Sequence, residues 1–132
     1  MLNTKINDIV QLLVVFLNLF DAKIKNYDVN EESIKGSVYW IDDESDEVQD
    51  FVFNNNLEGS QIKLVEKLSI FIKQNNLISS DKIKISEENL ISLLIKNQWN
   101  ETDAIEAVDS LCNIEVKMVD DGEETDSFFV HF

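Results

Sequence analysis

The chain has 132 residues, a length that fits one domain or one domain with an added subdomain. It carries 26 acidic residues against 11 lysines, and its charge of −15 argues against a generic binder of nucleic acids or anionic membranes, because phosphates would be repelled. A single cysteine excludes an internal disulfide framework, and three glycines are too few for a glycine-rich phosphate loop. With 44% hydrophobic residues, the chain is expected to fold around a core in a reducing, cytoplasmic compartment.

The charge is unevenly distributed along the chain. Residues 1–59 carry −8, residues 60–85 carry +3 and residues 86–132 carry −10. The lysines of the weakly basic middle segment are Lys63, Lys67, Lys73, Lys82 and Lys84. We expect them to face acidic groups of the same molecule.

The first predicted element is a helix over residues 6–20. This run is apolar almost throughout, and its polar residues, such as Gln11 and Asn18, recur at helical spacing. It is shorter than the roughly 20 residues that span a bilayer. We expect the helix to be buried in the chain's own core; the alternative is a homodimer seam against a second copy. Residues 21–33 are polar and are predicted to form a connector.

A β-hairpin is predicted next, with strands at residues 34–41 and 48–53, where β-branched and aromatic residues are frequent. Tyr39 and Trp40 point to opposite faces of their strand, so one of them is expected to be exposed. The hairpin tip is acidic, with Asp42, Asp43, Glu44, Asp46 and Glu47. It lacks the alternating ligands and central glycine of an EF-hand loop, so we expect a solvated turn without a metal ion.

The second half of the chain is predicted to contain three helices and a further hairpin. The helices begin at the capping residues Ser60, Ser86 and Asn100, and a short strand at 82–85 separates the first two. The last helix is expected to turn Ala104, Ile105, Val108, Leu111 and Cys112 inward. Trp99 lies in the turn between the paired helices, where it would fill the core. Strands at 114–118 and 128–132 are joined by a turn at 120–123.

This order of elements resembles a winged-helix domain, the helix-turn-helix variant that carries a β-hairpin wing. The resemblance covers residues 60–132 and rests on element order and apolar pattern rather than on an invariant motif. It implies an α+β fold class, with an N-terminal helix and β-hairpin in residues 1–59 followed by a winged-helix-like domain. The two parts would form either separate units or one compact unit.

The chain departs from DNA-binding winged helices in its charge. Their second paired helix usually presents basic or amide side chains to DNA. Here the outward positions of that helix are predicted to be Glu101, Thr102, Asp103, Glu106, Asp109, Ser110 and Asn113. The wing tip at 120–124 is acidic as well. Because carboxylates repel phosphates, we expect no direct nucleic-acid binding through this surface.

No catalytic arrangement is visible in the sequence. His131 is the single histidine and has no neighbouring nucleophile or orienting carboxylate in the sequence. Cys112 is predicted to lie inward among acidic neighbours, which do not favour a thiolate. The chain contains no arginine to clamp a phosphate or carboxylate substrate. We therefore predict a protein that is not an enzyme and that uses no cofactor.

The function that fits these features is an acidic protein-interaction module, of the inhibitor, immunity or adaptor type, that binds a basic partner protein. Such a surface would imitate the charge of a nucleic acid. The predicted contact residues are Asp103, Glu106 and Asp109, together with the acidic tip. The alternative is a transcription regulator that binds DNA as a dimer through another surface, with Lys63, Lys67, Lys82 and Lys84 gathered on one face.

Overall fold

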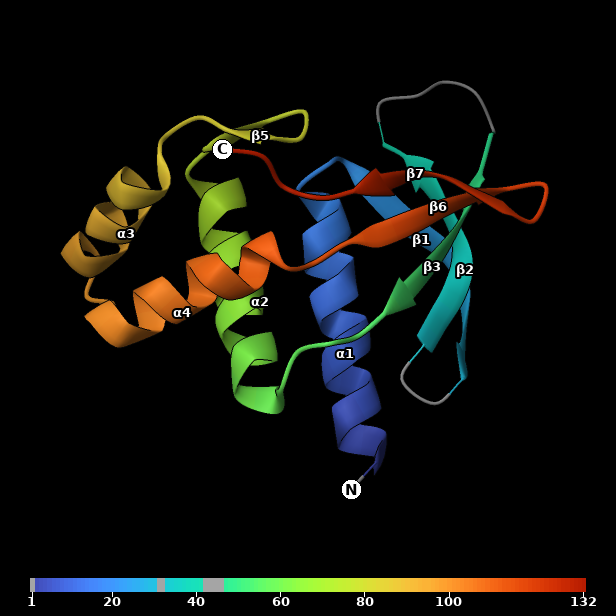
Figure 1. Cartoon of the computed structure of the whole chain (residues 1–132), viewed down its shortest axis with the longest axis horizontal. Coiled ribbons are helices and arrows are strands. Elements are labelled where there is room, and N and C mark those ends of the chain that lie inside the picture. Colours follow the sequence, from blue (N-terminus) through green and yellow to red (C-terminus); the bar gives the residue numbers. More distant parts are fainter. Residues whose placement is uncertain (1, 31–32, 42–46) are drawn as a thin grey trace.

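The computed structural model of the chain describes residues 2–30, 33–41 and 47–132, and these form a mixed α+β fold (Figure 1). The helices are α1 (Leu2–Asn18), α2 (Gly59–Gln74), α3 (Glu87–Lys96) and α4 (Glu101–Cys112). The strands are β1 (Ala22–Asn30), β2 (Ser33–Trp40), β3 (Gln49–Asn54), β4 (Ile78–Ser79), β5 (Lys82–Ile83), β6 (Val116–Asp120) and β7 (Glu123–Phe128). The α+β class expected from the sequence is confirmed.

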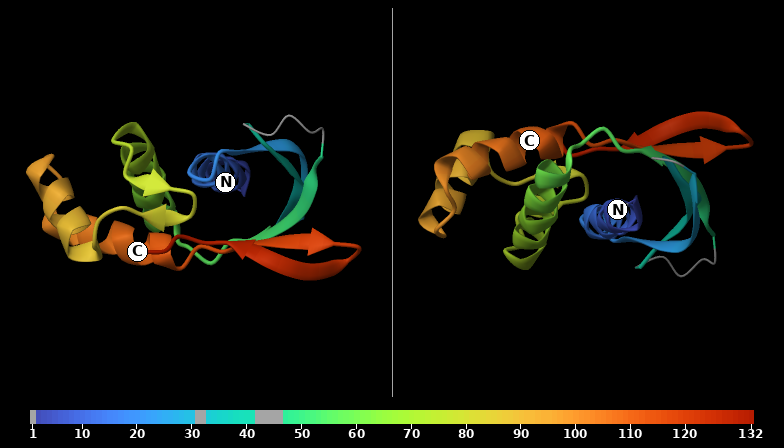
Figure 2. Two further views of the ribbon diagram at one scale, coloured as in Figure 1. Left: turned by 90° about the horizontal axis from the view of Figure 1, so that it is seen from above. Right: turned by 90° about the horizontal axis from the view of Figure 1, so that it is seen from below.

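One antiparallel sheet organises the molecule. Its five strands lie in the order β1-β2-β3-β6-β7, and β4 and β5 form a separate small sheet. The large sheet curls around α1, and α2 packs on the opposite side of that helix (Figure 2). Helices α3 and α4 lie beyond α2, at the end of the molecule away from the sheet (Figures 1 and 2).

The two parts of the chain at residues 1–59 and 60–132 share this sheet. Strand β3 of the first part pairs with β6 of the second, with Phe51 opposite Met118. Both parts also contribute to one hydrophobic core, which includes Phe16 from α1, Leu68 from α2 and Leu111 from α4. The core is therefore continuous across residue 59.

Helix α1 is confirmed and begins earlier than predicted. Its apolar residues are covered by the sheet on one side and by α2 on the other, which explains why the helix is apolar most of the way round. The fully or nearly fully buried members are Ile9, Leu12, Leu13, Phe16 and Leu17, and Leu19 and Phe20 in the turn that follows are buried too. Among the side chains described for this helix, Val14 is the large apolar one that is strongly exposed, at 44%.

The predicted connector at residues 21–33 is wrong, because residues 22–30 form β1. This strand lies at the edge of the sheet and pairs with β2 from Ala22 opposite Trp40 to Asn30 opposite Ser33. Only Ala22 of its nine residues is buried. A strand that turns most of its side chains to solvent shows no alternating apolar pattern in the sequence, which is why it was read as a polar connector.

The caps of the paired helices are as predicted, and that of α2 is not. The Ser86 hydroxyl accepts from the Asn89 N–H, and the Asn100 side chain accepts from the N–H groups of Thr102 and Asp103. Helix α2 instead starts after Glu58, whose N–H donates to the Gln61 side chain. Ser60 is therefore inside the first turn of the helix rather than its cap.

The strands of the second half differ in extent from the prediction. Strand β5 ends at Ile83, β6 is shifted to Val116–Asp120, and β7 ends at Phe128. The segment that follows β7 crosses to β5, where the Ile83 N–H donates to the His131 carbonyl at 2.7 Å. In the described part of the chain, no helix combines the length and apolarity needed to cross a membrane.

Candidate functional site

The exposed side of α4 is acidic, as expected. Of the seven positions predicted to face outward, Glu101, Thr102, Asp103, Asp109 and Asn113 are exposed. Ser110 was placed there wrongly and is only 2% exposed, because it shares the buried side with Ala107 and Leu111.

Ile105 and Cys112 were predicted to lie inward, and both are exposed. Their spacing from Glu101 and Asp109 explains this result. Residues 101, 105, 109 and 112 are separated by four, four and three positions, which places them along one side of a helix. We call Glu101, Ile105 and Asp109 the acidic face of α4. Asp103 is exposed as well, but it is two positions from both Glu101 and Ile105 and lies on another side of the helix.

Glu106 differs from the other predicted contact residues of α4. It is half-buried, and its Oε1 accepts a hydrogen bond of 2.8 Å from Nε2 of Gln61. Gln61 in turn accepts from the N–H that precedes α2. Glu106 therefore ties α4 to the start of α2, whereas Asp103 and Asp109 are free to face a partner.

The acidic tip of the β2–β3 hairpin is described only in part. Asp42, Asp43, Glu44 and Asp46 lie outside the described residues, and Glu47 is exposed. The hairpin and α4 lie toward opposite ends of the long axis of the molecule (Figure 1). A partner that contacts both would have to extend along the molecule.

The acidic surface continues from α4 onto α3. The Cys112 thiol donates a weak hydrogen bond to Oε1 of Glu87, with 3.8 Å between sulfur and oxygen. Partial burial, followed by the charges of Glu87 and Asp109, raises the pKa of Cys112 to about 11. The thiol is therefore exposed yet protonated at neutral pH, and carboxylates from two helices surround it.

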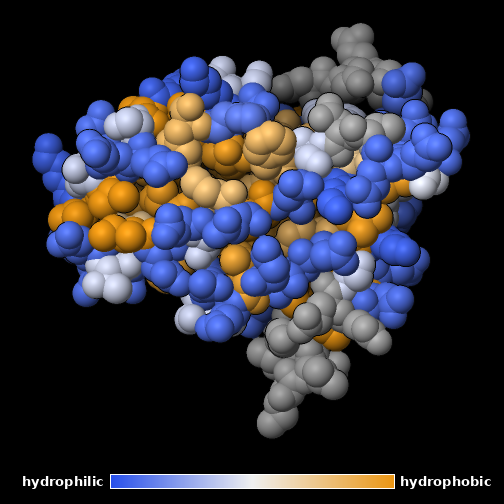
Figure 3. Space-filling model, in the orientation of Figure 1, coloured by the Kyte–Doolittle hydropathy of each residue, from blue (hydrophilic) through white to orange (hydrophobic). Residues whose placement is uncertain are grey.

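Apolar side chains are interspersed with these acids. Ile95 of α3 and Ile105 of α4 are 42% and 44% exposed. Figure 3 shows apolar surface between polar side chains at the end of the molecule that α3 and α4 form. The surface is thus amphipathic rather than uniformly charged.

The lysines of the middle segment do not behave alike. Nζ of Lys73 pairs with Oδ1 of Asp21 at 2.6 Å, as expected for self-compensating charges. Nζ of Lys67 instead lies over the Trp99 ring, 4.5 Å from its centroid. The remaining lysines of this segment are exposed, namely Lys63, Lys82 and Lys84.

Trp99 itself is 9% exposed, which confirms the prediction that it fills the core.

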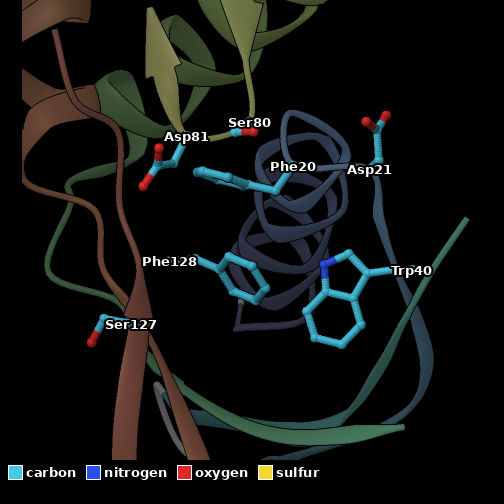
Figure 4. A pocket seen from close by; sticks show the side chains of 7 residues that line it. All are labelled: Phe20, Asp21, Trp40, Ser80, Asp81, Ser127 and Phe128. Atoms are coloured by element: carbon cyan, nitrogen blue, oxygen red, sulfur yellow. The ribbon is translucent and has the colours of Figure 1, made fainter. Parts of the chain in front are cut away.

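A hollow of about 520 Å³ lies elsewhere, where four distant segments meet (Figure 4). We call it the aromatic hollow. Its lining residues are Phe20, Asp21, Trp40, Ser80, Asp81, Ser127 and Phe128. Nothing in the sequence pattern indicated it, because these residues come from the end of α1, the end of β2, the β4–β5 turn and the end of β7.

Three rings form a continuous wall of the aromatic hollow. The centroid of Phe128 is 5.1 Å from that of Phe20 and 5.9 Å from that of Trp40. Trp40 is half-buried while its neighbour Tyr39 is 38% exposed, so the two residues face opposite sides of the sheet as predicted.

Two carboxylates stand at the edge of the aromatic hollow. Asp81 lies beside Phe20, on the side away from Trp40, whereas the carboxylate of Asp21 points away from the rings (Figure 4) and binds Lys73. Oδ2 of Asp81 is 3.5 Å from Nε2 of His131. His131 therefore has a carboxylate neighbour that the sequence did not reveal, because the two residues are 50 positions apart.

No group of three or more histidine, cysteine or carboxylate side chains suited to a metal ion is found among the described residues. Comparison of the chain with models of protein families, with curated proteins and with solved structures finds no match. The function therefore has to be inferred from the side chains and their geometry.

Proposed function

We propose that this chain is an acidic protein-interaction module and that the acidic face of α4 binds a basic partner protein. The observation that carries the proposal is the composition of this face, where the exposed Ile105 lies between Glu101, one turn before it, and Asp109, one turn after it. The resemblance to a winged helix adds that this is the helix such a domain would present to DNA.

The mixture of acids and isoleucines favours a protein partner over a nucleic acid. Each carboxylate would repel phosphates and would remove the counterion release that drives binding to DNA. Ile105 and Ile95 offer apolar contact area, which the centre of a protein interface uses. The charge of −15 would also accelerate encounter with a basic partner, in a way that salt weakens.

An inhibitor, immunity protein or adaptor would use such a surface in the same manner. It would cover a basic face of its partner, which is the face that binds nucleic acid if the partner is a nuclease or a DNA-binding protein. The tip residues Asp42–Glu47 are proposed as a second contact region.

The first test is recovery of the partner. The tagged chain is incubated with extract of the source cells, washed at low and then high salt, and the eluate is identified by mass spectrometry. A basic protein released by salt supports the proposal. Nucleic acid in the eluate, or recovery of the chain alone, contradicts it.

The second test locates the surface. Glu101→Lys combined with Asp109→Lys should weaken binding to that protein about tenfold or more, because two attractive charges become repulsive. The matched control is Asp28→Lys with Asp120→Lys, which changes the net charge equally at exposed positions on β1 and β6. Equal weakening by both pairs would show that only the net charge matters.

DNA binding by a dimer remains the alternative. A seam on α1 would have few apolar groups to use, because most of them are buried in the core of the chain. Lys67 is engaged with Trp99, which leaves Lys63, Lys82 and Lys84 for phosphates. A gel shift at low salt and micromolar protein tests this alternative, and a shifted band would favour it.

A further inference from the structure

We infer that the aromatic hollow binds an alkylammonium group, presented as a lysine side chain of the basic partner. The source of the lysine rests on the proposed function. The affinity of the hollow for the cation does not, and it is measured separately. The hollow and α4 are built from different elements, so each can be altered without changing the other.

The first argument is the aromatic wall. A cation is attracted to the face of an aromatic ring within about 6 Å of its centroid, and tryptophan is the strongest of these partners. In the hollow, Phe128 lies between Phe20 and Trp40 and is in ring contact with both. Trp40 and Phe128 remain only half-buried, so their surfaces are accessible from the hollow.

The second argument is the charge at the edge. Asp81 is exposed and lies beside Phe20 (Figure 4), and its Oδ2 is 3.5 Å from Nε2 of His131. Asp21 is already paired with Lys73, so Asp81 is the carboxylate that remains to attract a cation. An anionic ligand would meet this carboxylate and the negative surface of the whole chain, whereas a cation would be drawn to both.

The third argument is the size and shape of the space. About 520 Å³ lies within the range of ligand pockets, and it accommodates the apolar stem of a lysine together with its ammonium head. The stem would lie against the rings while the head approaches Asp81. Long charged side chains usually bind in this way, with the methylene groups on apolar surface and the charged group in polar surroundings.

The chain itself contains the same kind of contact. The ammonium group of Lys67 lies 4.5 Å from the centroid of Trp99. In the hollow, the ammonium head from another molecule would lie between Asp81 and the ring of Phe20, and its stem would extend over Phe128 toward Trp40 (Figure 4). Lys67 and Trp99 also provide an internal reference, since Trp99 is buried away from the hollow and should not respond to the ligand.

The test is an NMR titration of the full chain with n-butylammonium chloride at constant ionic strength. The indole N–H signals of Trp40 and Trp99 are followed, and n-butanol serves as the neutral probe of similar shape. We expect a saturable shift of the Trp40 signal with the ammonium probe, in the millimolar range, and little change at Trp99. The absence of a shift, or equal shifts with n-butanol, would overturn the inference.

Variants then assign the contribution of each group. Asp81→Asn should weaken binding of n-butylammonium by about threefold or more, whereas Asp28→Asn, with the same change in net charge, should leave it nearly unchanged. In Trp40 variants, which lack that indole signal, binding is followed by the backbone N–H signal of Phe128. Trp40→Leu should abolish the binding and Trp40→Phe should retain part of it, with the Trp99 signal reporting that the fold is intact. Equal effects of Asp81→Asn and Asp28→Asn would show that the hollow is not the site.

A final comparison decides the source of the cation. Nα-acetyl-lysine methylamide should bind at least as well as choline. If choline alone binds, the hollow takes a small quaternary ammonium ligand, and the assignment to a partner lysine is wrong. Neither titration involves the partner protein. If charge reversal on α4 leaves partner binding unchanged, cation binding by the hollow still stands. If the hollow binds no cation, the proposed role of α4 still stands.

Discussion

Gly36 of β2 packs directly against the backbone of Asn26 in β1. A β-carbon at Gly36 would collide with the Asn26 carbonyl oxygen and would lie 2.8 Å from the Cα of Tyr27. The β1–β2 register shifts between Ile24 and Asn26, so the close approach occurs where β1 carries its irregularity. A glycine is needed here because the neighbouring backbone occupies the space of a side chain.

Gly36→Ala should therefore destabilise the protein by about 2–3 kcal/mol, because one strand has to move away from the other. The measurement is the free energy of unfolding from urea titration. Gly59→Ala is the control, since a β-carbon there meets nothing within 4 Å and the residue begins α2. That variant should be as stable as the parent or slightly more so. Equal losses in the two variants would contradict the explanation.

Ser69→Ala should stabilise the protein. Ser69 is 1% exposed within α2, and in the described structure its hydroxyl finds no hydrogen-bond partner. Removing an unsatisfied buried hydroxyl should raise the free energy of unfolding by about 1 kcal/mol. Ser92→Ala, at an exposed position of α3, measures the gain from helix propensity alone. A gain at Ser69 no larger than that at Ser92 would show that the hydroxyl carries no penalty.

Gln98→Gly should also stabilise the protein. Gln98 follows α3 with a φ of 73°, in the left-handed region that favours glycine. Its N–H still donates to the Ile95 carbonyl, so the turn itself is retained in the variant. We expect a gain of roughly 0.5–1 kcal/mol in thermal or urea unfolding. Gln74→Gly at the end of α2 is the matched control and should instead destabilise the protein.

The elements that the sequence predicted well are those with a local signal. Ser86 and Asn100 are caps because their side chains bond to N–H groups two or three residues later, and such spacing is readable in the chain. The phase of α4 was misread because Ile105 is apolar and Ser110 is polar, yet the first is exposed and the second is buried. Cys112, also expected to face inward, is exposed as well, so hydrophobicity alone misplaced three positions of the helix that carries the proposed site.

The aromatic hollow could not be predicted, for a different reason. Phe20, Trp40 and Phe128 are separated by 20 and 88 positions and meet only because the sheet curls around α1. No local pattern records that curvature. The sequence predicts only that Tyr39 and Trp40 face opposite sides of their strand, and the residues that make Trp40 part of a hollow are brought to it by the tertiary structure.

The Cys112 thiol should react slowly with alkylating reagents although it is exposed. Only the thiolate reacts, and partial burial together with Glu87 and Asp109 raises the pKa to about 11 from an ordinary value of 9.0. Between pH 9 and pH 11, Cys112 is largely ionised in the unfolded chain and largely protonated in the folded chain. The contribution of this thiol to stability is therefore complete below pH 9 and is lost as the pH rises toward 11.

The measurement is the rate of reaction with iodoacetamide between pH 7 and pH 11. The rate for the chain unfolded in urea should be half-maximal near pH 9 and level off above it, whereas the rate for the folded protein should become half-maximal only near pH 11. Glu87→Gln removes a charge beside the sulfur and should raise the rate at pH 8 about threefold or more. Glu88→Gln makes the same change one residue away and should leave the rate nearly constant. Coincident pH profiles for folded and unfolded chains would mean that Glu87 and Asp109 do not surround Cys112 as described, and the acidic surface would then not extend from α4 onto α3.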